Sequence, residues 1–272
     1  MSGNKTILGL VGSPNPEGRT NQLVSAALES ASQAGAAVEL IQMSEHVVTA
    51  CRDCLPWVCL RNLKCTYEDE SFELLCQKIL DCGGLVFGTP VYWWDTSAMV
   101  RYLMLKMFRV YAMSGPLAGL PAFGIAIAGG TGNGLISGLR PLYHFFQIMQ
   151  MRALDPVPVT RFDMPQSIER ARELGRCIAP MAEARVPFKH RDEGLLWYDR
   201  IPYLAEDRVA ERRLLAAITA EAVPEDRKAD IEGDLARVDI LAASGRTLEA
   251  MAEIGRIYGS STKLLSEKQP AS

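Results

Sequence analysis

Four cysteines lie within fifteen residues of one another and are the densest group of potential metal ligands in the chain: Cys51, Cys54, Cys59 and Cys65. Four thiolates can supply the four corners of a [4Fe-4S] cluster, which is one of the interpretations that the residues leave open. A four-thiolate zinc site and unligated cysteines in a structural loop are the competing interpretations. A CxxC pair alone would fit a dithiol redox site, but four cysteines together make that interpretation less economical.

A second stretch with chemical potential is the turn from Gly12 to Asn21 (GSPNPEGRTN). It follows the apolar run Thr6 to Val11 and precedes a helical pattern from Arg19 to Ala34. Hydroxyl groups and free backbone N–H groups at a helix N-terminus bind anions, and the helix dipole favours negative charge there. The turn is therefore predicted to hold a phosphate, with an ordinary strand-to-helix turn as the alternative.

These two stretches must be positioned by a regular alternation of strands and helices. Strands are predicted at residues 6–11, 37–43, 83–87, 120–128 and 153–160, and helices at residues 19–34, 71–80, 97–111, 135–151 and 166–184. The alternation predicts an open, doubly wound α/β sheet, in which ligands bind beyond the C-terminal ends of the strands. Pro156 and Pro158 favour an edge position for the fifth strand.

Three loops would converge at that edge of the sheet, because they follow the first, third and fourth strands. They are the phosphate turn, the aromatic loop from Gly88 to Trp94 (GTPVYWW) and the glycine-rich loop from Gly129 to Gly134 (GGTGNG). Three consecutive aromatic residues cannot all point inward, so at least one should be available to cover a planar ligand. For the glycine-rich loop, the residues alone leave open a flexible turn or a row of amides that face a ligand.

The loops resemble those of the flavodoxin-like NAD(P)H-dependent FMN reductases and the related iron-sulfur flavoproteins. The family's phosphate loop, GSPRKGGNT, is matched without a gap by residues 12–20, and its flavin loop, TPVYWWG, is matched by residues 89–95. The resemblance covers residues 5 to 160. It implies a flavodoxin-like, five-stranded parallel sheet of order 2-1-3-4-5 with FMN as its cofactor.

The resemblance also implies which residues surround FMN. Those implied for the phosphate are Ser13, Asn15, Arg19, Thr20 and Asn21. Those implied for the isoalloxazine ring are Thr89, Pro90, Val91, Tyr92, Trp93, Trp94, Gly130, Thr131 and Gly132. The chain departs from the pattern because Asn15 replaces a basic residue, Arg19 replaces an asparagine and Asp95 replaces a glycine. The positive charge has moved within the loop, and a guanidinium at Arg19 can pair bidentately with phosphate oxygens.

The iron-sulfur flavoproteins carry a compact four-cysteine motif at the place of Cys51 to Cys65. That motif usually has two residues between its second and third cysteines, whereas this chain has four, so the match is in type and place. The resemblance implies a homodimer or homotetramer with the cysteine loop near the flavin of a neighbouring subunit. The other three cysteines, Cys76, Cys82 and Cys177, fall on apolar faces and are predicted to be buried small hydrophobic residues.

Composition narrows the class of partner. The chain has 272 residues, a formal charge of -3 and a pI near 5.7, without the basic excess that attracts nucleic acid. No apolar run is long enough to span a bilayer, and the first residues lack the features of a signal peptide. We therefore expect a cytoplasmic protein, no membrane partner, and metal or redox chemistry at the cysteines rather than disulfides. The partner is expected to be a small-molecule or protein electron donor or acceptor.

The C-terminal third differs from the rest of the chain. We predict a flavodoxin-like FMN-binding domain at residues 1–185, a linker or arm at residues 186–205 and a helical C-terminal extension at residues 206–272. The extension is predicted to hold helices at residues 206–222, 224–243 and 247–258, followed by a frayed tail from Ser260. Narrow apolar stripes on these helices predict packing on the core or on another subunit.

Other charged residues give no stronger site. Arg101, Lys106 and Arg109 lie on one predicted helix and are interpreted as a solvated basic face. The three histidines are dispersed, and no hydrolase constellation is present.

The sequence thus predicts an FMN-dependent oxidoreductase that accepts electrons from NAD(P)H or a carrier protein, with a [4Fe-4S] cluster as a single-electron relay. One alternative is a cluster-free NAD(P)H-dependent FMN or quinone reductase. The other is a non-catalytic flavin-binding module that docks a partner through its C-terminal helices.

Overall fold

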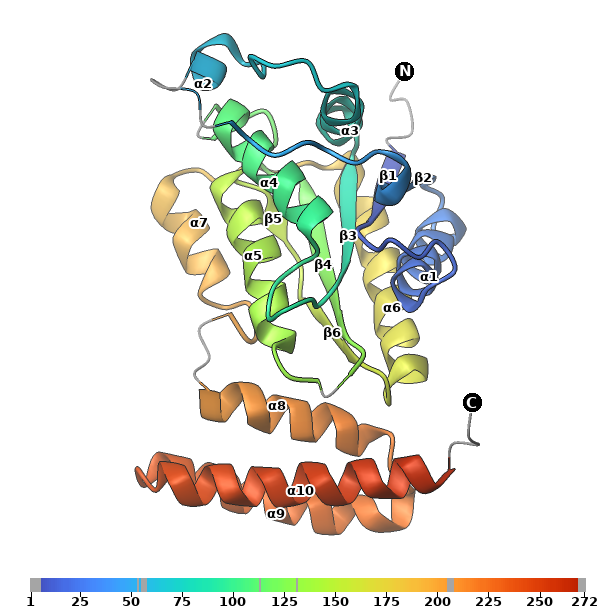
Figure 1. The fold of residues 1–272 in the computed structure, drawn as a ribbon, viewed down its shortest axis with the longest axis vertical. Helices are drawn as coiled ribbons and strands as arrows, with labels where there is room; N and C mark the ends of the chain where they lie inside the picture. Colours follow the sequence, from blue (N-terminus) through green and yellow to red (C-terminus); the bar gives the residue numbers. More distant parts are fainter. Residues whose placement is uncertain are drawn as a thin grey trace.

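A parallel sheet with helices on both faces forms most of the molecule, and three further helices form a separate layer beyond one end of the sheet (Figure 1). The computed structural model describes residues 6–52, 54, 58–112, 114–130, 132–204 and 208–268. The strands are β1 (Thr6–Val11), β2 (Ala37–Gln42), β3 (Gly84–Pro90), β4 (Pro121–Ala128), β5 (Arg152–Ala153) and β6 (Val157–Thr160). The helices of the sheet layers are α1 (Arg19–Gln33), α2 (Val58–Asn62), α3 (Glu70–Asp81), α4 (Ala98–Tyr111), α5 (Leu135–Ile148), α6 (Met164–Glu183) and α7 (Arg191–Tyr198), with a short 3-10 turn at Met43–Glu45.

The strand order is β2-β1-β3-β4-β5 with every pair parallel, which confirms the predicted order 2-1-3-4-5. The predicted fifth strand is divided into two pieces. β5 pairs with the start of β4, and β6 pairs with its end, from Ile125 to Ala128. Pro158 lies in β6 beside Ala126, and the edge position tolerates a residue that has no N–H group to donate.

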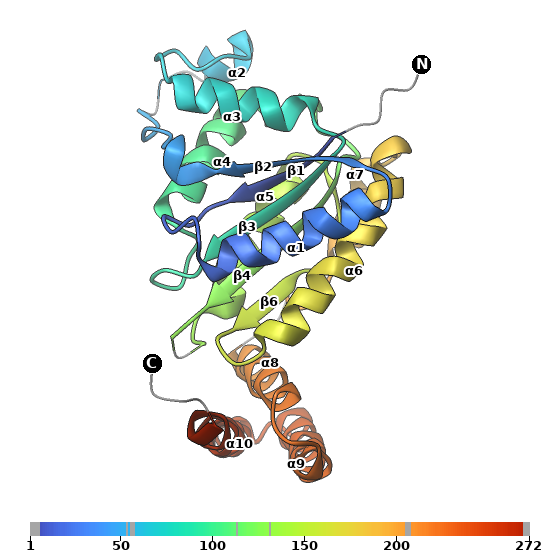
Figure 2. The same cartoon turned by 90° about the vertical axis from the view of Figure 1, so that its right-hand side faces the viewer.

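Two hydrophobic clusters fill the space between the sheet and its helices. α1 and α6 cover one face, and α3, α4 and α5 cover the other (Figure 2). β3 and β4 are buried on both faces, which is why their sequences are nearly continuous apolar runs. Gly175 brings α6 against α1, because an added Cβ there would lie 2.1 Å from the Ala27 carbonyl oxygen.

The segment predicted as a linker or arm packs on this core. It contains α7, which the sequence analysis missed because eight residues are too few to show a helical period. The Trp197 indole donates to the Ala153 carbonyl at 2.8 Å, and the Tyr198 hydroxyl donates to the Met151 carbonyl at 2.9 Å. Residues 186–204 are thereby fixed to the end of α5 and to β5.

The C-terminal helices form a unit with its own small core. They are α8 (Arg208–Glu221), α9 (Glu225–Ala243) and α10 (Thr247–Lys268). The prediction of a frayed tail from Ser260 was wrong up to Lys268, because α10 continues and buries Ser261 and Leu265. None of the helices in the described part of the chain is long and apolar enough to cross a membrane.

Two cysteines outside the four-cysteine segment behave as predicted and one does not. Cys76 and Cys82 are buried, and burial raises the pKa of the Cys76 thiol to about 11 and that of the Cys82 thiol to about 12. Both are therefore protonated, inert core residues. Cys177 was predicted to be buried and is exposed, because it lies on a side of α6 that neither α1 nor the sheet covers.

Candidate functional site

The phosphate turn leads from the end of β1 into the first turn of α1. Gly18 is the N-cap residue, and among the described residues no side chain caps the helix. The turn is shaped by local bonds, since Ser13 Oγ accepts from the Asn15 amide at 3.2 Å and Asn15 Oδ1 accepts from the Glu17 amide at 3.0 Å. The backbone N–H groups of the first turn of α1 are therefore available to bind an anion, and the helix dipole favours negative charge at this position.

The predicted phosphate residues divide into buried and open ones. Ser13 and Thr20 are buried, and Asn21 is half-buried with its side-chain oxygen accepting from Ser25 Oγ at 3.1 Å. Arg19 is exposed, and its Nη1 lies 3.7 Å from the position that a Cβ on Gly129 would occupy. The Arg19 guanidinium therefore spans from the phosphate turn to the loop after β4.

The aromatic loop after β3 makes a tight turn that displays its rings. The Tyr92 amide donates to the Asp95 carbonyl at 2.9 Å and the Asp95 amide donates to the Tyr92 carbonyl at 3.0 Å. Trp93 and Trp94 occupy the centre of the turn with φ of 52° and 60°, a left-handed conformation that is costly for bulky residues. Trp93 is 90% exposed, and its ring meets the Trp94 ring edge to face at 5.9 Å.

Asp95 fixes this turn to α4, and it replaces the glycine of the family motif described above. Its Oδ1 accepts from the Thr96 amide at 2.7 Å, and its Oδ2 accepts from Arg101 Nη2 at 2.6 Å and Nε at 3.1 Å. Thr89 is fully buried and accepts from the Ser97 amide at 3.1 Å, so it shapes the loop from inside. Pro90 and Val91, which lie between Thr89 and the aromatic turn, are half-buried. The Val91 amide donates to the Ile127 carbonyl at 2.8 Å.

The glycine-rich loop after β4 passes beside Trp94. Gly130 is exposed, whereas Gly132 and Gly134 are buried with φ of 75° and 81°. An added Cβ on Gly134 would lie 2.7 Å from Trp94 Cδ1, so only glycine allows this contact. Thr131 lies outside the described residues, and its predicted contact with FMN stays a prediction.

The three loops meet at the carboxyl ends of β1, β3 and β4, as the strand pattern predicts (Figure 1). The Gly12 amide donates to the Gly88 carbonyl at 2.8 Å, and the Ser97 hydroxyl donates to the Gly12 carbonyl at 2.6 Å. A Cβ on Gly12 would lie 2.1 Å from Val100 Cγ2, so the backbones approach as closely as glycine permits. This place combines the amides at the N-terminus of α1, the Arg19 guanidinium and exposed aromatic rings. The amides and the guanidinium can bind the phosphate of FMN, and the rings can stack on its isoalloxazine.

The four-cysteine segment folds over the other end of α4. Cys51, Cys54, Cys59 and Cys65 all line one cavity of about 80 Å³, together with Lys106 and Arg109. The Cys59 thiol donates to the Arg109 carbonyl at 3.1 Å, and Arg109 Nη2 donates to the Cys54 carbonyl at 2.9 Å. Asp53 and residues 55–57 lie outside the described residues. Within the described ranges, no three Cys, His, Asp or Glu side chains are arranged to hold a metal ion.

A buried ion pair attaches both ends of the four-cysteine segment to α4. Lys106 pairs with Asp69, and both side chains are 3% exposed. Asp69 also accepts from the Thr49 amide at 2.9 Å and hydroxyl at 2.7 Å, and from the Phe72 amide at 3.0 Å. Burial raises the pKa of the Asp69 carboxyl, but the hydrogen bonds from Lys106, Thr49 and Phe72 outweigh burial and lower it to about 2. The carboxylate is therefore ionised and ties residues 49 and 69 to α4.

The interpretation of Lys106 and Arg109 as part of a solvated basic face was wrong. Lys106 is 3% exposed and Arg109 is 8% exposed, because the cysteine segment and the start of α3 cover this side of α4. Only Arg101 of the three is substantially exposed. The sequence analysis named both residues but did not connect them with the cysteines. Their spacing of three along one helix was the available signal, since it places two cations on one face.

The cysteine cavity and the aromatic loop lie at opposite ends of α4. The helix starts directly after the aromatic loop, and its last turns carry Arg109 beside the cysteines. Fourteen residues at 1.5 Å each give a separation of about 20 Å.

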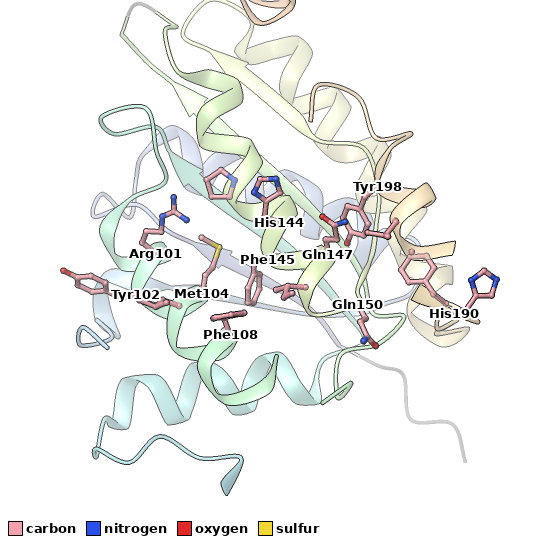
Figure 3. Close-up of a pocket in the computed structure, with 16 residues that line it drawn as sticks. Arg101, Tyr102, Met104, Phe108, His144, Phe145, Gln147, Gln150, His190 and Tyr198 are labelled. Atoms are coloured by element: carbon pink, nitrogen blue, oxygen red, sulfur yellow. The ribbon is translucent and has the colours of Figure 1, made fainter. Parts of the chain in front are cut away.

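A larger cavity of about 1220 Å³ lies elsewhere, between α4, α5 and α7 (Figure 3). Its walls include Phe108, Phe145 and Tyr198, and Arg101 and His144 stand at one side. Burial lowers the pKa of His144, with further lowering by the Arg140 and Arg101 charges, so this histidine is neutral near pH 7. The cavity holds neither the phosphate-binding amides nor the displayed tryptophans, and the three loops are therefore the better candidate for a cofactor.

Comparisons with known proteins agree with this geometry. The family model described as NADPH-dependent FMN reductase matches residues 6–161. An iron-sulfur flavoprotein of Methanocaldococcus jannaschii is 28% identical over 145 residues, which are 53% of this chain and 73% of that protein. An iron-sulfur flavoprotein of Archaeoglobus fulgidus is 22% identical over 193 residues, 69% of this chain and 85% of that protein. Among solved structures, a flavone reductase superimposes with a TM-score of 0.52 and 17% identity over 65% of this chain and 62% of that one, a likeness of fold.

Proposed function

Because this chain belongs to the NADPH-dependent FMN reductase family and is a flavin-dependent oxidoreductase, we propose that it relays electrons between FMN and a [4Fe-4S] cluster on the Cys51–Cys65 loop. The observation that carries the proposal is that all four cysteines line one cavity beside two buried cations. Bound FMN would accept two electrons from NAD(P)H, or electrons from a carrier protein, and would pass them to the acceptor. The names of the two archaeal relatives support the same assignment.

Each loop of the flavin site has a distinct task in this proposal. Arg19 and the first amides of α1 bind the phosphate, with Ser13, Asn15, Thr20 and Asn21 shaping the turn around it. The turn from Tyr92 to Asp95 orients the ring and shields it from water. The backbone amides of Gly130 and Gly132 would stabilise negative charge on bound FMN.

The cysteine cavity has the composition that an anionic cluster requires. Cys51, Cys54, Cys59 and Cys65 supply the four thiolates, and the cluster supplies one-electron transfer. The buried charge of Arg109 opposes the negative charge of the cluster, and the carboxylate of Asp69 keeps Lys106 in place.

The cysteine cavity and the flavin loops of one chain are about 20 Å apart along α4, whereas the family resemblance implies a cysteine loop close to the flavin of a neighbouring subunit. We therefore propose a homodimer or homotetramer.

Cofactor analysis of anaerobically purified protein tests the proposal. We expect one FMN per chain and four iron atoms per chain, with iron-sulfur absorbance beside the flavin bands. Cys54→Ser is expected to lose the iron and keep FMN. Cys177→Ser is the matched control, because Cys177 is exposed and lies away from the cavity, and it should keep both. Wild-type protein with FMN and without iron would reject the cluster.

A cluster-free NAD(P)H-dependent FMN or quinone reductase is the second candidate. It is favoured by the absence, within the described ranges, of three side chains arranged to hold a metal ion. It predicts steady NAD(P)H oxidation by iron-free protein and no change of that rate in Cys54→Ser. The non-catalytic docking module, the third interpretation of the sequence, is disfavoured by the family assignment.

A further inference from the structure

α8 of the C-terminal unit packs directly on the glycine-rich loop of the flavin site. An added Cβ on Gly132 would lie 2.5 Å from Leu215 Cδ1, so the Leu215 side chain fills the space above this glycine. Next to it, Arg212 Nη1 donates to Asn133 Oδ1 at 2.8 Å. The family model ends at residue 161, so α8 lies outside the matched region.

The same loop is held on its other side by the aromatic turn. The Gly134 backbone packs against Trp94, with 2.7 Å between the position of an added Cβ and Trp94 Cδ1. The loop is therefore clamped between Leu215 of α8 and Trp94 of the aromatic loop. Two of its glycines, Gly132 and Gly134, have φ of 75° and 81°. Because glycine has no side chain to restrict its backbone, this conformation depends on contacts on both sides.

α8 is itself firmly attached to the sheet layers, as a positioning element must be. Phe162, which follows β6, inserts into the core of the C-terminal unit. Ile218 of α8 belongs to the main core, and Glu221 at the end of α8 pairs with Arg170 of α6 at 2.7 Å. Both views place α8 between the carboxyl end of the sheet and the other two helices of the unit (Figure 1, Figure 2).

We propose that α8 is a positioning element of the flavin site, which acts through Leu215 and Arg212 on the glycine-rich loop. The helix holds the loop amides in the arrangement that contacts the flavin ring, so the C-terminal unit sets both the affinity for FMN and the stability of its reduced form. Leu215 and Arg212 are positioning residues. The inference rests on the proposed flavin site and is independent of the cluster.

Leucine-to-alanine variants test the apolar contact. Leu215→Ala removes the side chain above Gly132, and we expect FMN to bind about tenfold more weakly, a loss of about 1.4 kcal/mol. The midpoint potential of bound FMN should also become more negative, because the amides stabilise the reduced ring less well. Leu235→Ala is the control, since Leu235 is similarly buried in the same C-terminal unit, within its own core. It should lower the unfolding temperature and leave the potential unchanged.

Arginine variants test the polar contact without disturbing a core. Arg212 is exposed and reaches the loop, whereas its neighbour Arg213 pairs with Asp239 of α9 at 2.7 Å. We expect Arg212→Ala to weaken FMN binding about threefold and Arg213→Ala to leave it unchanged. These variants keep the inference testable if Leu215→Ala fails to fold.

Glycine variants separate backbone strain from the contact. Gly132 and Gly245 have nearly the same φ, 75° and 74°, but only a Cβ on Gly132 meets Leu215, and a Cβ on Gly245 meets open space. Alanine at either position strains the backbone similarly. Only Gly132→Ala should change FMN affinity and potential.

The outcomes distinguish this inference from the proposed function. If wild-type protein binds no FMN, the proposed function fails. If wild-type protein binds FMN and the potential is the same in wild type, Leu215→Ala, Arg212→Ala and Gly132→Ala, only the role of α8 is overturned. A shift in the three loop-facing variants with none in Leu235→Ala, Arg213→Ala and Gly245→Ala supports it.

Discussion

The flavin loops and the cysteine cavity stand at the two ends of α4 and are built in different ways. The flavin loops are joined by backbone groups, as in the bond from the Gly12 amide to the Gly88 carbonyl, and glycines set their spacing. The cysteine cavity is joined by side chains around the buried pair of Lys106 and Asp69. A site made from backbone is largely preformed, whereas a site made from side chains depends on each ion pair and ligand. The two should therefore respond separately to substitution.

Removal of the Asp69 carboxylate should have the largest effect and should fall on the cysteine end. Asp69→Ala leaves the Lys106 ammonium buried and unpaired, which costs about 3–5 kcal/mol of unfolding free energy. Iron content should fall more than FMN content. Glu39→Ala, which breaks the exposed pair with Lys78, is the control and should cost less than about 1 kcal/mol. Denaturant unfolding measures the stability, and chemical analysis measures the iron and FMN contents. Equal loss of both cofactors would contradict the claim that the two sites respond separately.

A change at Gly12 should reverse that selectivity. Gly12→Ala forces a Cβ to within 2.1 Å of Val100 Cγ2 and 2.9 Å of the Gly88 carbonyl oxygen, so β1, β3 and α4 must move apart. We expect a loss of up to about 3 kcal/mol of stability and release of FMN. Iron should be retained when the variant is purified at low temperature. Retention of FMN at the wild-type level would show that the close approach of these loops is not needed for the cofactor.

Acid should weaken the cysteine end through Asp69. The pKa of this carboxyl is 3.8 in the unfolded chain and about 2 in the folded protein, so the folded state binds its proton less readily. The stabilisation is complete above pH 3.8 and is lost as pH falls toward 2, about 2 kcal/mol in total. The difference in unfolding free energy between wild type and Asp69→Asn, measured from pH 6 to pH 2, should shrink over this interval. A constant difference would contradict the assigned pKa.

The smallest expected effect concerns the strained tryptophan turn. Asparagine tolerates a left-handed conformation better than tryptophan, so Trp93→Asn should raise stability by about 0.5–1 kcal/mol. FMN should bind more weakly because the displayed ring is lost. Calorimetry and fluorescence titration give the two quantities. Higher stability with undiminished FMN affinity would remove Trp93 from the flavin site.

The parts of the molecule that depend on local pattern were predictable from sequence. The doubly wound sheet and the convergence of three loops follow from the alternation of strands and helices, the strand order follows from the family resemblance, and the edge position of the fifth strand follows from Pro158. The break between β5 and β6 was not predicted, because it depends on how the edge strand meets β4. The bounds of β3 and α4 were correct to within a few residues, since long apolar periods mark them.

The parts that depend on tertiary contact were not predictable. Lys106 and Arg109 look like surface residues until the cysteine segment covers them. α7 is too short to show a helical period, and it is held by the hydrogen bonds of Trp197 and Tyr198 to the core. The last turns of α10 depend on packing against neighbouring helices, which buries Leu265. The contact of Leu215 with Gly132 joins residues 83 positions apart, and no local signal marks it.

Anaerobic reduction with NAD(P)H tests the relay most directly, with the visible spectrum recorded through the reaction. If FMN and a cluster exchange electrons, the flavin bands and the iron-sulfur absorbance of wild-type protein should both bleach, whereas in Cys54→Ser only the flavin bands should bleach. An iron-sulfur absorbance that persists unchanged after the flavin is fully reduced would contradict the relay.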